Sequence, residues 1–237
     1  KTALRRYVVP DEHGQDNGRY TLSSLYYDSP DLRCYRENEQ GLKFRRKLRI
    51  RRYETNEVFA DDSPVFLEVK QRYDRVTQKR RTVLPYRDAL RLCNDRQIPG
   101  NGSGDKALLD ETYVFLWQYN LSSVSLVRYD RQAFVGTEYD RGLHVTFDTS
   151  LSFQAHQLHL HEPSSSLPML PASSVVMEIK VNERIPGGAS TIGTPTAMAS
   201  ATTRWQVRAA ICPRATTEAL VEDSPGNVRG LDGHRSA

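Results

Sequence analysis

Alternation of basic and apolar residues at positions 42–54 restricts most strongly how this chain can fold. The stretch LKFRRKLRIRRYE carries Phe44, Leu48 and Ile50 between a series of cations. Successive side chains of a β-strand point to opposite faces, so a strand here has one apolar side and one basic side. The basic side consists of Lys43, Arg45, Lys47, Arg49 and Arg51. On a single strand such a row is most often a solvated surface.

The same two-sided pattern recurs on stretches far apart in the sequence. VFLEVK at 65–70 and VVMEIKV at 175–181 each place a Glu two residues before a Lys, opposite apolar residues. Other alternating polar sets are Lys79 with Arg81, Tyr129 with Arg131, and His144 with Thr146 and Asp148. If a sheet of such strands closes with these sides inward, its lumen is lined with Lys and Arg. The pattern therefore favours an anion-binding tunnel over a solvated surface.

Runs rich in Tyr, Val, Ile, Leu and Phe between polar turns predict an α+β fold that is mainly antiparallel β. The expected strands are 20–28, 42–54, 64–72, 77–84, 124–135, 142–149 and 175–182. Helices are expected at 86–96 and 106–119. In the second helix an apolar stripe is formed by Leu108, Leu109, Thr112, Phe115 and Leu116.

The composition changes at Pro186. Every Tyr, Phe and Lys lies before this residue, and the remainder is rich in Ala, Thr and Gly. Few large apolar side chains remain there to offset an ordering entropy of about 1–2 kcal/mol per residue. We expect a folded domain over 1–186 and a low-complexity, disordered tail over 187–237, in which residues 205–210 are the one candidate for a short helix.

Charge and cysteine content exclude several classes of protein. The net charge of +4, from 33 Lys and Arg against 29 Asp and Glu, does not by itself identify a partner. Cys34, Cys93 and Cys212 are far apart, which indicates neither a disulfide framework nor a zinc site. No apolar run has the roughly 20 residues that a membrane-spanning helix needs. We expect a cytoplasmic protein that does not insert into a membrane.

Crowded cations in a lumen need a counter-ion, because each uncompensated buried charge costs several kcal/mol. Phosphate chains suit this environment, since Arg offers forked contacts, Lys a point charge, and a carboxylate can hold a divalent metal that bridges phosphate oxygens. A Glu two residues before a Lys places both kinds of ligand on one side of a strand, about 7 Å apart.

Taken in order, several motifs resemble the VTC (vacuolar transporter chaperone) domain, which belongs to the CYTH-like triphosphate tunnel metalloenzymes. They are SLYYDS at 24–29, RKLRIRRY at 46–53, the FLEVK and MEIK strands, KRRTVL at 79–84, RYDRQAF at 128–134, VTFDTSL at 145–151 and ERIP at 183–186. The resemblance implies a tunnel barrel with a few flanking helices. It also implies a polymerase that transfers the terminal phosphate of ATP onto inorganic polyphosphate with Mn²⁺ or Mg²⁺.

The resemblance also implies roles for individual residues. The triphosphate and the growing chain would be held by Arg49, Arg51, Lys70, Lys79, Arg131 and Lys180, with Tyr129 beside them. His144 occupies a position where the family usually has an inward Arg, and it would contact phosphate more weakly. Glu178 would hold the metal. Apart from the resemblance, the residues around Glu68 favour a role as partner of neighbouring Lys or Arg over one as a second metal ligand.

Two further departures from the family pattern affect the barrel, which we expect to be incomplete at both ends. Only about 19 residues precede the SLYYD strand, where the family has an additional strand carrying a basic ligand, and the Ser-Lys strand that completes the tunnel is not found after ERIP. The change of composition after Pro186 suggests a truncated or frame-shifted reading of the gene.

Two alternatives to a polymerase stay open. One is a tunnel-fold triphosphatase, which usually needs more inward carboxylates. The other is a non-catalytic domain that binds polyphosphate. Nucleic acid is not an expected partner, because the basic rows face strands that contain carboxylates rather than an open stacking surface. A membrane-protein partner is neither indicated nor excluded.

Overall fold

An antiparallel sheet of 11 strands organises the chain in the computed structural model, which describes residues 7–100, 104–137, 142–161, 166–180, 206–209 and 219–222. The strands are β1 (Val8–Pro10), β2 (Arg19–Asp28), β3 (Phe44–Glu54), β4 (Pro64–Tyr73), β5 (Val76–Pro85), β6 (Ser122–Gly136), β7 (His144–Gln154), β8 (Leu167–Pro168), β9 (Val176–Lys180), β10 (Gln206–Ala209) and β11 (Ala219–Glu222). The helices are α1 (Gln15–Gly18), α2 (Arg33–Glu39), α3 (Tyr86–Asp95) and α4 (Lys106–Gln118).

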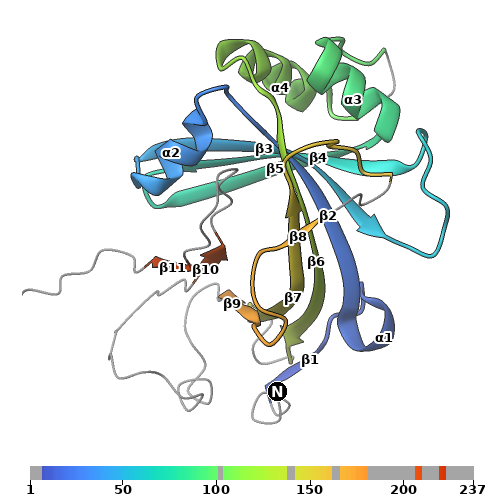
Figure 1. Ribbon diagram of the computed structural model, residues 1–237, viewed down its shortest axis with the longest axis vertical. Coiled ribbons are helices and arrows are strands. Elements are labelled where there is room, and N and C mark those ends of the chain that lie inside the picture. The colour runs from blue at the N-terminus through green and yellow to red at the C-terminus, as the bar shows by residue number, and fades with distance from the viewer. Residues whose placement is uncertain are drawn as a thin grey trace, which may run out of the picture.

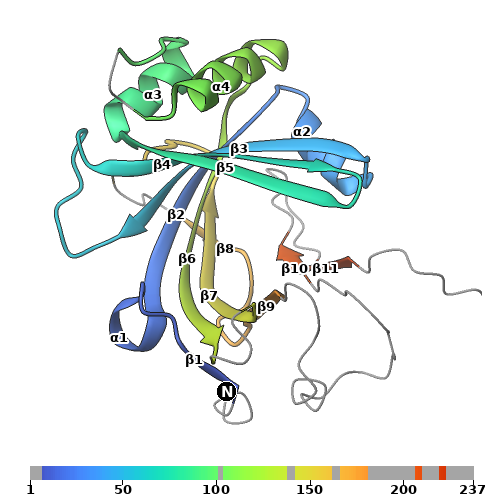
Figure 2. The same cartoon turned by 180° about the vertical axis from the view of Figure 1, so that it is seen from behind.

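The sheet has two parts, one around β2, β6 and β7 and the other formed by β3, β4 and β5 (Figure 1). Its main path runs β11-β10-β9-β7-β6-β2-β3-β4-β5, while β1 pairs with β6 and β8 pairs with β7. In both views β3, β4 and β5 cross the direction of β2, β6 and β7, so the sheet bends sharply between β2 and β3 (Figures 1 and 2). Within the described ranges β5 and β11 are the two ends of this path, and the predicted barrel is therefore an open, bent sheet.

Helices α2, α3 and α4 lie on one side of β3–β5 (Figure 1). The main apolar core lies between them and the sheet, and includes Leu48, Ile50, Leu67, Leu92 and Phe115, all without exposed surface. Burying a side chain of this size stabilises the fold by roughly 1.5–3 kcal/mol. We call this side of the sheet the outer face and the opposite side the basic face.

The two arginines that interrupt the apolar side of β3 are accommodated by aromatic rings. The Arg46 guanidinium lies 4.0 Å from the ring centre of Phe115, and Arg52 lies 4.0 Å from that of Phe59. Arg46 also donates to Gln118 Oε1 at 2.9 Å. Cation–π contact allows both charges to lie at the edge of the apolar core. The alternation of residues 44–54 is thus kept throughout β3.

Helix α2 was not expected from the sequence, and a side chain of the preceding strand explains it. Asp28, at the end of β2, is buried, and its carboxylate accepts hydrogen bonds from the backbone N–H groups of Cys34 and Tyr35 at 2.8 and 2.9 Å. These N–H groups belong to the first turn of the helix, which has no intrahelical acceptor for them. The carboxylate therefore anchors α2 to β2.

The predicted fold class, mainly antiparallel β with flanking helices, is confirmed. Each expected strand and both expected helices are present, with ends shifted by a few residues except for β7, which continues to Gln154. The apolar stripe expected in α4 is buried. On β9 the expected apolar side is partly exposed, because Met177 lies beyond the helices and is 37% exposed; Val181 lies outside the described residues.

At the two ends of the chain the described strands are short. β1 pairs with the end of β6 and carries no Lys or Arg, so it does not supply the basic ligand of the family's additional strand. Residues 206–209, where a short helix was considered, form strand β10. Most of 187–237 lies outside the described residues, and the domain boundary at Pro186 stays a prediction. Among the described helices, none is long and apolar enough to cross a membrane.

Candidate functional site

Strands β3, β4 and β5 align their basic residues in direct register. Lys47, Lys70 and Lys79 stand opposite one another across the three strands. The neighbouring row on the same face aligns Arg49, Glu68 and Arg81. Like charges directly opposite each other in a sheet are destabilising. The lysine row therefore makes this part of the basic face a favourable place for an anion.

Glu68 is the carboxylate at the centre of this region. Its side chain is 1% exposed and forms ion pairs of 2.6 Å with both Arg49 and Lys79. Burial raises the pKa of Glu68, but Arg49 and Arg51 outweigh this effect and hold the pKa at about 2. The carboxylate is thus ionised at neutral pH and fixes two of the predicted phosphate ligands. This agrees with the sequence-based expectation that Glu68 pairs with cations.

Strand β2 supplies hydroxyl groups that hold the arginines of β3. Arg51 is buried and donates from Nε to Ser24 Oγ at 3.0 Å, and Arg49 donates from Nη1 to the Tyr26 hydroxyl at 3.1 Å. Burial alone would raise the pKa of Tyr26, but the positive charges of Arg49 and Arg51 lower it by a larger amount. The resulting pKa is about 8. Arg51 is therefore positioned by a neutral hydroxyl group, which leaves its charge available to an anion, whereas Arg49 is also paired with the Glu68 carboxylate.

Tyr129 connects this region with a second ionic group on β6 and β7. Its hydroxyl accepts a hydrogen bond from Arg51 Nη2 at 3.1 Å, and Arg131 lies over its ring at 5.2 Å. Arg131 in turn forms two bonds of 2.7 Å to Asp148. Burial alone would lower the pKa of Arg131, but the bonds to Asp148 raise it by a larger amount. The pKa of Arg131 is therefore above its ordinary value. Tyr129 thus positions two predicted phosphate ligands at once.

An apolar cluster lies on the same face between the two ionic groups. It consists of Leu22, Val127, Tyr129, Leu151 and Met169, and Leu170 packs against it. The Met169 N–H donates to the Leu151 carbonyl at 2.8 Å, which ties the segment after β8 to β7. The basic face is therefore not one continuous polar surface, as the simple alternation of polar and apolar residues suggested.

The edge formed by β7 and β9 carries the predicted metal ligand. Glu178 stands opposite Thr146, and Lys180 opposite His144. The Glu178 carboxylate lies 3.1 Å from the Lys180 ammonium group and its side chain is 17% exposed. Thr146 Oγ1 is buried and has no hydrogen-bond partner among the described residues. A carboxylate beside an unsatisfied hydroxyl provides hard oxygen ligands of the kind that Mg²⁺ and Mn²⁺ prefer.

All predicted site residues lie on the basic face. They are Arg49, Arg51, Lys70, Lys79, Tyr129, Arg131, His144, Glu178 and Lys180. Arg51, Tyr129 and Arg131 are joined by contacts, and Arg49 and Lys79 are joined through Glu68. Lys180, Glu178 and His144 are brought together on the separate β7–β9 edge. The face also carries Lys47, and on the described strands its cations outnumber Glu68, Asp148 and Glu178.

Ser24, Tyr26 and Asp148 are the positioning residues that the sequence did not identify. The Tyr26 hydroxyl accepts a hydrogen bond from Arg49, and Asp148, within β7, accepts two from Arg131. The available signal was the alternation of β2, which places Ser24 and Tyr26 on one side of the strand. The pairing of β2 with β3, which turns that side toward the arginines, is a property of the assembled sheet.

Comparison with known proteins agrees with the motifs. The family model of the VTC domain matches residues 1–200. Among solved structures, a crystal structure from Bacillus halodurans, reported as a "putative adenylate cyclase", is similar to this chain at 12% identity. The similarity covers 63% of this chain and 71% of that chain, with a TM-score of 0.37. No curated protein matches the chain at a significant level.

Proposed function

The chain belongs to the VTC domain family, and from this premise we propose that it is an ATP-dependent polyphosphate polymerase. The observation that carries the proposal is the excess of cations on the basic face, where Lys47, Lys70 and Lys79 stand in one row. A row of like charges is stabilised by a linear polyanion that contacts all of its members. Polyphosphate and the triphosphate of ATP are such anions.

In this proposal the phosphate ligands are Arg49, Arg51, Lys70, Lys79, Arg131 and Lys180. Tyr129 is the positioning residue that orients Arg51 and Arg131, as its two contacts indicate. His144, opposite Lys180 and exposed, contributes a weaker contact at the end of the row. The arginines provide forked donors that fit phosphate oxygens, and the lysines provide point charges.

The reaction lengthens the chain by one phosphate. An oxygen of the terminal phosphate attacks the γ-phosphorus of ATP, a new P–O–P linkage forms, the bond to the β–γ bridging oxygen breaks, and ADP leaves. Phosphoryl transfer depends on alignment and on stabilising charge at the phosphate oxygens. The fixed guanidinium groups of Arg49 and Arg51 perform both tasks, since their hydrogen bonds restrict their orientation.

A divalent metal, Mn²⁺ or Mg²⁺, fits the residues of the β7–β9 edge. Glu178 and the unsatisfied hydroxyl of Thr146 would hold it. No group of three or more His, Cys, Asp or Glu gathers in the described residues, so phosphate oxygens and water would complete the coordination, as is usual for Mg²⁺. When bound, the metal neutralises charge on the phosphate oxygens.

Product analysis tests this proposal against the two alternatives. The purified chain is incubated with ATP and Mn²⁺, and polyphosphate and free phosphate are measured separately. The matched variants are Glu178→Gln and Glu57→Gln, because Glu57 is an exposed acidic residue in the β3–β4 connection. We expect polyphosphate from the parent and from Glu57→Gln, and strongly reduced polymer from Glu178→Gln. Free phosphate without polymer would instead indicate a triphosphatase, and neither product a binding domain.

A further inference from the structure

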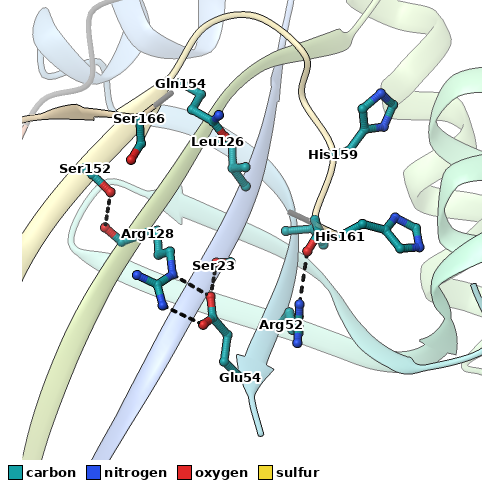
Figure 3. A pocket seen from close by; sticks show the side chains of 11 residues that line it. Ser23, Arg52, Glu54, Leu126, Arg128, Ser152, Gln154, His159, His161 and Ser166 are labelled. Carbon is teal, nitrogen blue, oxygen red and sulfur yellow. Dashed lines mark hydrogen bonds and ion pairs between the residues drawn. The ribbon is translucent and has the colours of Figure 1, made fainter. Parts of the chain in front are cut away.

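A cavity of about 180 Å³ lies on the outer face of the sheet, on the opposite side from the proposed polymerase site. Its walls come from β2, β3, β6 and β7 and from the segment around Leu160 (Figure 3). Ser23 and Arg52, which line it, are the immediate neighbours of Ser24 and Arg51 on the basic face. The cavity is therefore separated from the polymerase site by the sheet itself.

A forked ion pair forms one wall of this cavity. Arg128 donates from Nε and Nη2 to the two carboxylate oxygens of Glu54, both at 2.8 Å, and Ser23 Oγ donates to the same carboxylate at 2.7 Å. These bonds occupy one edge of the Arg128 guanidinium. Its other terminal nitrogen, Nη1, makes no hydrogen bond within the described part of the chain. Arg128 is thus fixed in orientation and retains donors for a further acceptor.

Positive charge predominates in the cavity. Arg52 also lines it and is held by a bond of 3.1 Å from Nη1 to the Leu160 carbonyl, so two guanidinium groups face one carboxylate. Asp130 is the next acidic residue on this side of β6, but it accepts a bond from Thr21 at 2.8 Å and does not line the cavity. Figure 3 shows the His159 and His161 rings pointing away from the ion pair.

Hydroxyl groups complete the set of donors. Ser152 and Ser166 line the cavity on the side of β7, and the Ser166 hydroxyl points toward its interior in Figure 3. Guanidinium and hydroxyl groups together are the usual ligands of tetrahedral oxyanions. At about 180 Å³ the cavity is smaller than the roughly 300–1,000 Å³ of sites that enclose drug-sized molecules, and its size therefore favours a small anion over a nucleotide.

We propose that this cavity binds a single inorganic phosphate ion, with Arg128 and Arg52 as its cationic ligands. One anion with a charge of about −1 to −2 balances the guanidinium charge that Glu54 leaves uncompensated. Glu54 competes with the anion for Arg128 and at the same time orients it. The site is independent of the proposed polymerase activity, because none of its side chains lies on the basic face.

Titration of the full chain with orthophosphate, followed by calorimetry, tests this site. The basic face also attracts phosphate, so the double variant Arg49→Gln/Lys79→Gln is used as a background in which that contribution is weakened. In this background we expect phosphate binding to persist. Adding Arg128→Gln should weaken it about tenfold or more, since charge-assisted bonds are lost. Adding Glu54→Gln instead should strengthen it about three- to tenfold, because a competing charge is removed.

The opposite signs of the two variants separate a binding site from a purely structural ion pair. Glu54→Gln and Arg128→Gln both disrupt the same pair, so a structural effect would change binding in the same direction for both. Circular dichroism verifies that each variant is folded, and Arg128→Lys, which keeps the charge but not the fork, should bind at an intermediate level. Loss of all phosphate binding in the Arg49→Gln/Lys79→Gln background would overturn the proposal, as would binding of AMP as tight as that of phosphate.

Discussion

The two faces of β3 treat neighbouring arginines in opposite ways. On the outer face Arg46 and Arg52 lie over aromatic rings at the edge of the core, and Arg52 also lines the cavity beside Arg128. On the basic face Arg49 and Arg51 bond to Glu68, Tyr26 and Ser24 and stand beside further cations. Residue type is the same on both sides, and the surroundings alone decide the role. A basic residue in a strand therefore indicates a site only when its contacts in the folded chain are known.

The largest difference between the two faces is expected in stability, when adjacent residues on opposite faces are replaced. Leu48→Ala removes a fully buried side chain from the core and should lower the free energy of unfolding by about 2–5 kcal/mol. Lys47→Ala, one residue away on the basic face, should change it by less than about 0.5 kcal/mol or increase it, because a like-charge row is relieved. Urea denaturation measures both values. Equal losses for the two variants would contradict the assignment of the faces.

The acid stability of the chain should depend on Glu68. Its pKa in the folded chain is about 2, below its ordinary value of 4.5. A depressed pKa contributes stability that is complete above pH 4.5 and is lost as the pH falls toward 2. The shift corresponds to about 3 kcal/mol. Denaturation of the parent between these pH values should show this loss.

Glu68→Gln is the matched control for the acid experiment. The variant should be less stable than the parent at neutral pH, because Arg49 and Lys79 lose their partner. Its dependence on pH between about 4.5 and 2 should be weaker by the same 3 kcal/mol. A variant with the same acid transition as the parent would show that another carboxylate is responsible.

An Arg→Lys substitution on each face should affect the polymerase activity differently. Arg51→Lys keeps the charge but loses the forked bonds to Ser24 and Tyr129, and should reduce polyphosphate formation about 10- to 100-fold. Arg46→Lys, on the outer face of the same strand, should leave polymer formation within about twofold. The initial rate of polymer formation from ATP measures this difference. Similar losses for both variants would place the reaction elsewhere.

The smallest effect is expected from replacing an outer-face charge by an apolar side chain. Arg46→Met loses the cation–π contact with Phe115 but also removes a buried Nε that has no hydrogen-bond partner in the described residues. These effects oppose each other, so the free energy of unfolding should change by less than about 1 kcal/mol. The melting temperature provides the measurement. A large loss would mean that Arg46 is required for the fold rather than tolerated by it.

Local features were predicted well from the sequence. The alternation in 42–54 and the Glu-x-Lys pattern at 68–70 and 178–180 place the same side chains on one face in the structure. This succeeds because the direction of a side chain in a strand depends only on its position along that strand. Helix α4 was predicted for the same kind of reason, since its apolar stripe follows the helical period.

Contacts between strands could not be predicted in this way. Tyr26 meets Arg49, and Asp148 meets Arg131, only because of the order and register in which β2, β3, β6 and β7 pair. The helix α2 depends likewise on a carboxylate of another element, Asp28. The apolar cluster around Met169 was missed because the segment after β8 folds back over the sheet.

The sequence by itself determined which residues share a face of each strand and, through its motifs, the family to which the chain belongs. Both depend on short-range order along the chain. Only the tertiary structure decided that Glu68 fixes Arg49 and Lys79, that Tyr129 joins Arg51 to Arg131, and that a cationic cavity lies behind them. These arrangements bring together residues distant in sequence, and their geometry follows from the pairing and bending of the whole sheet.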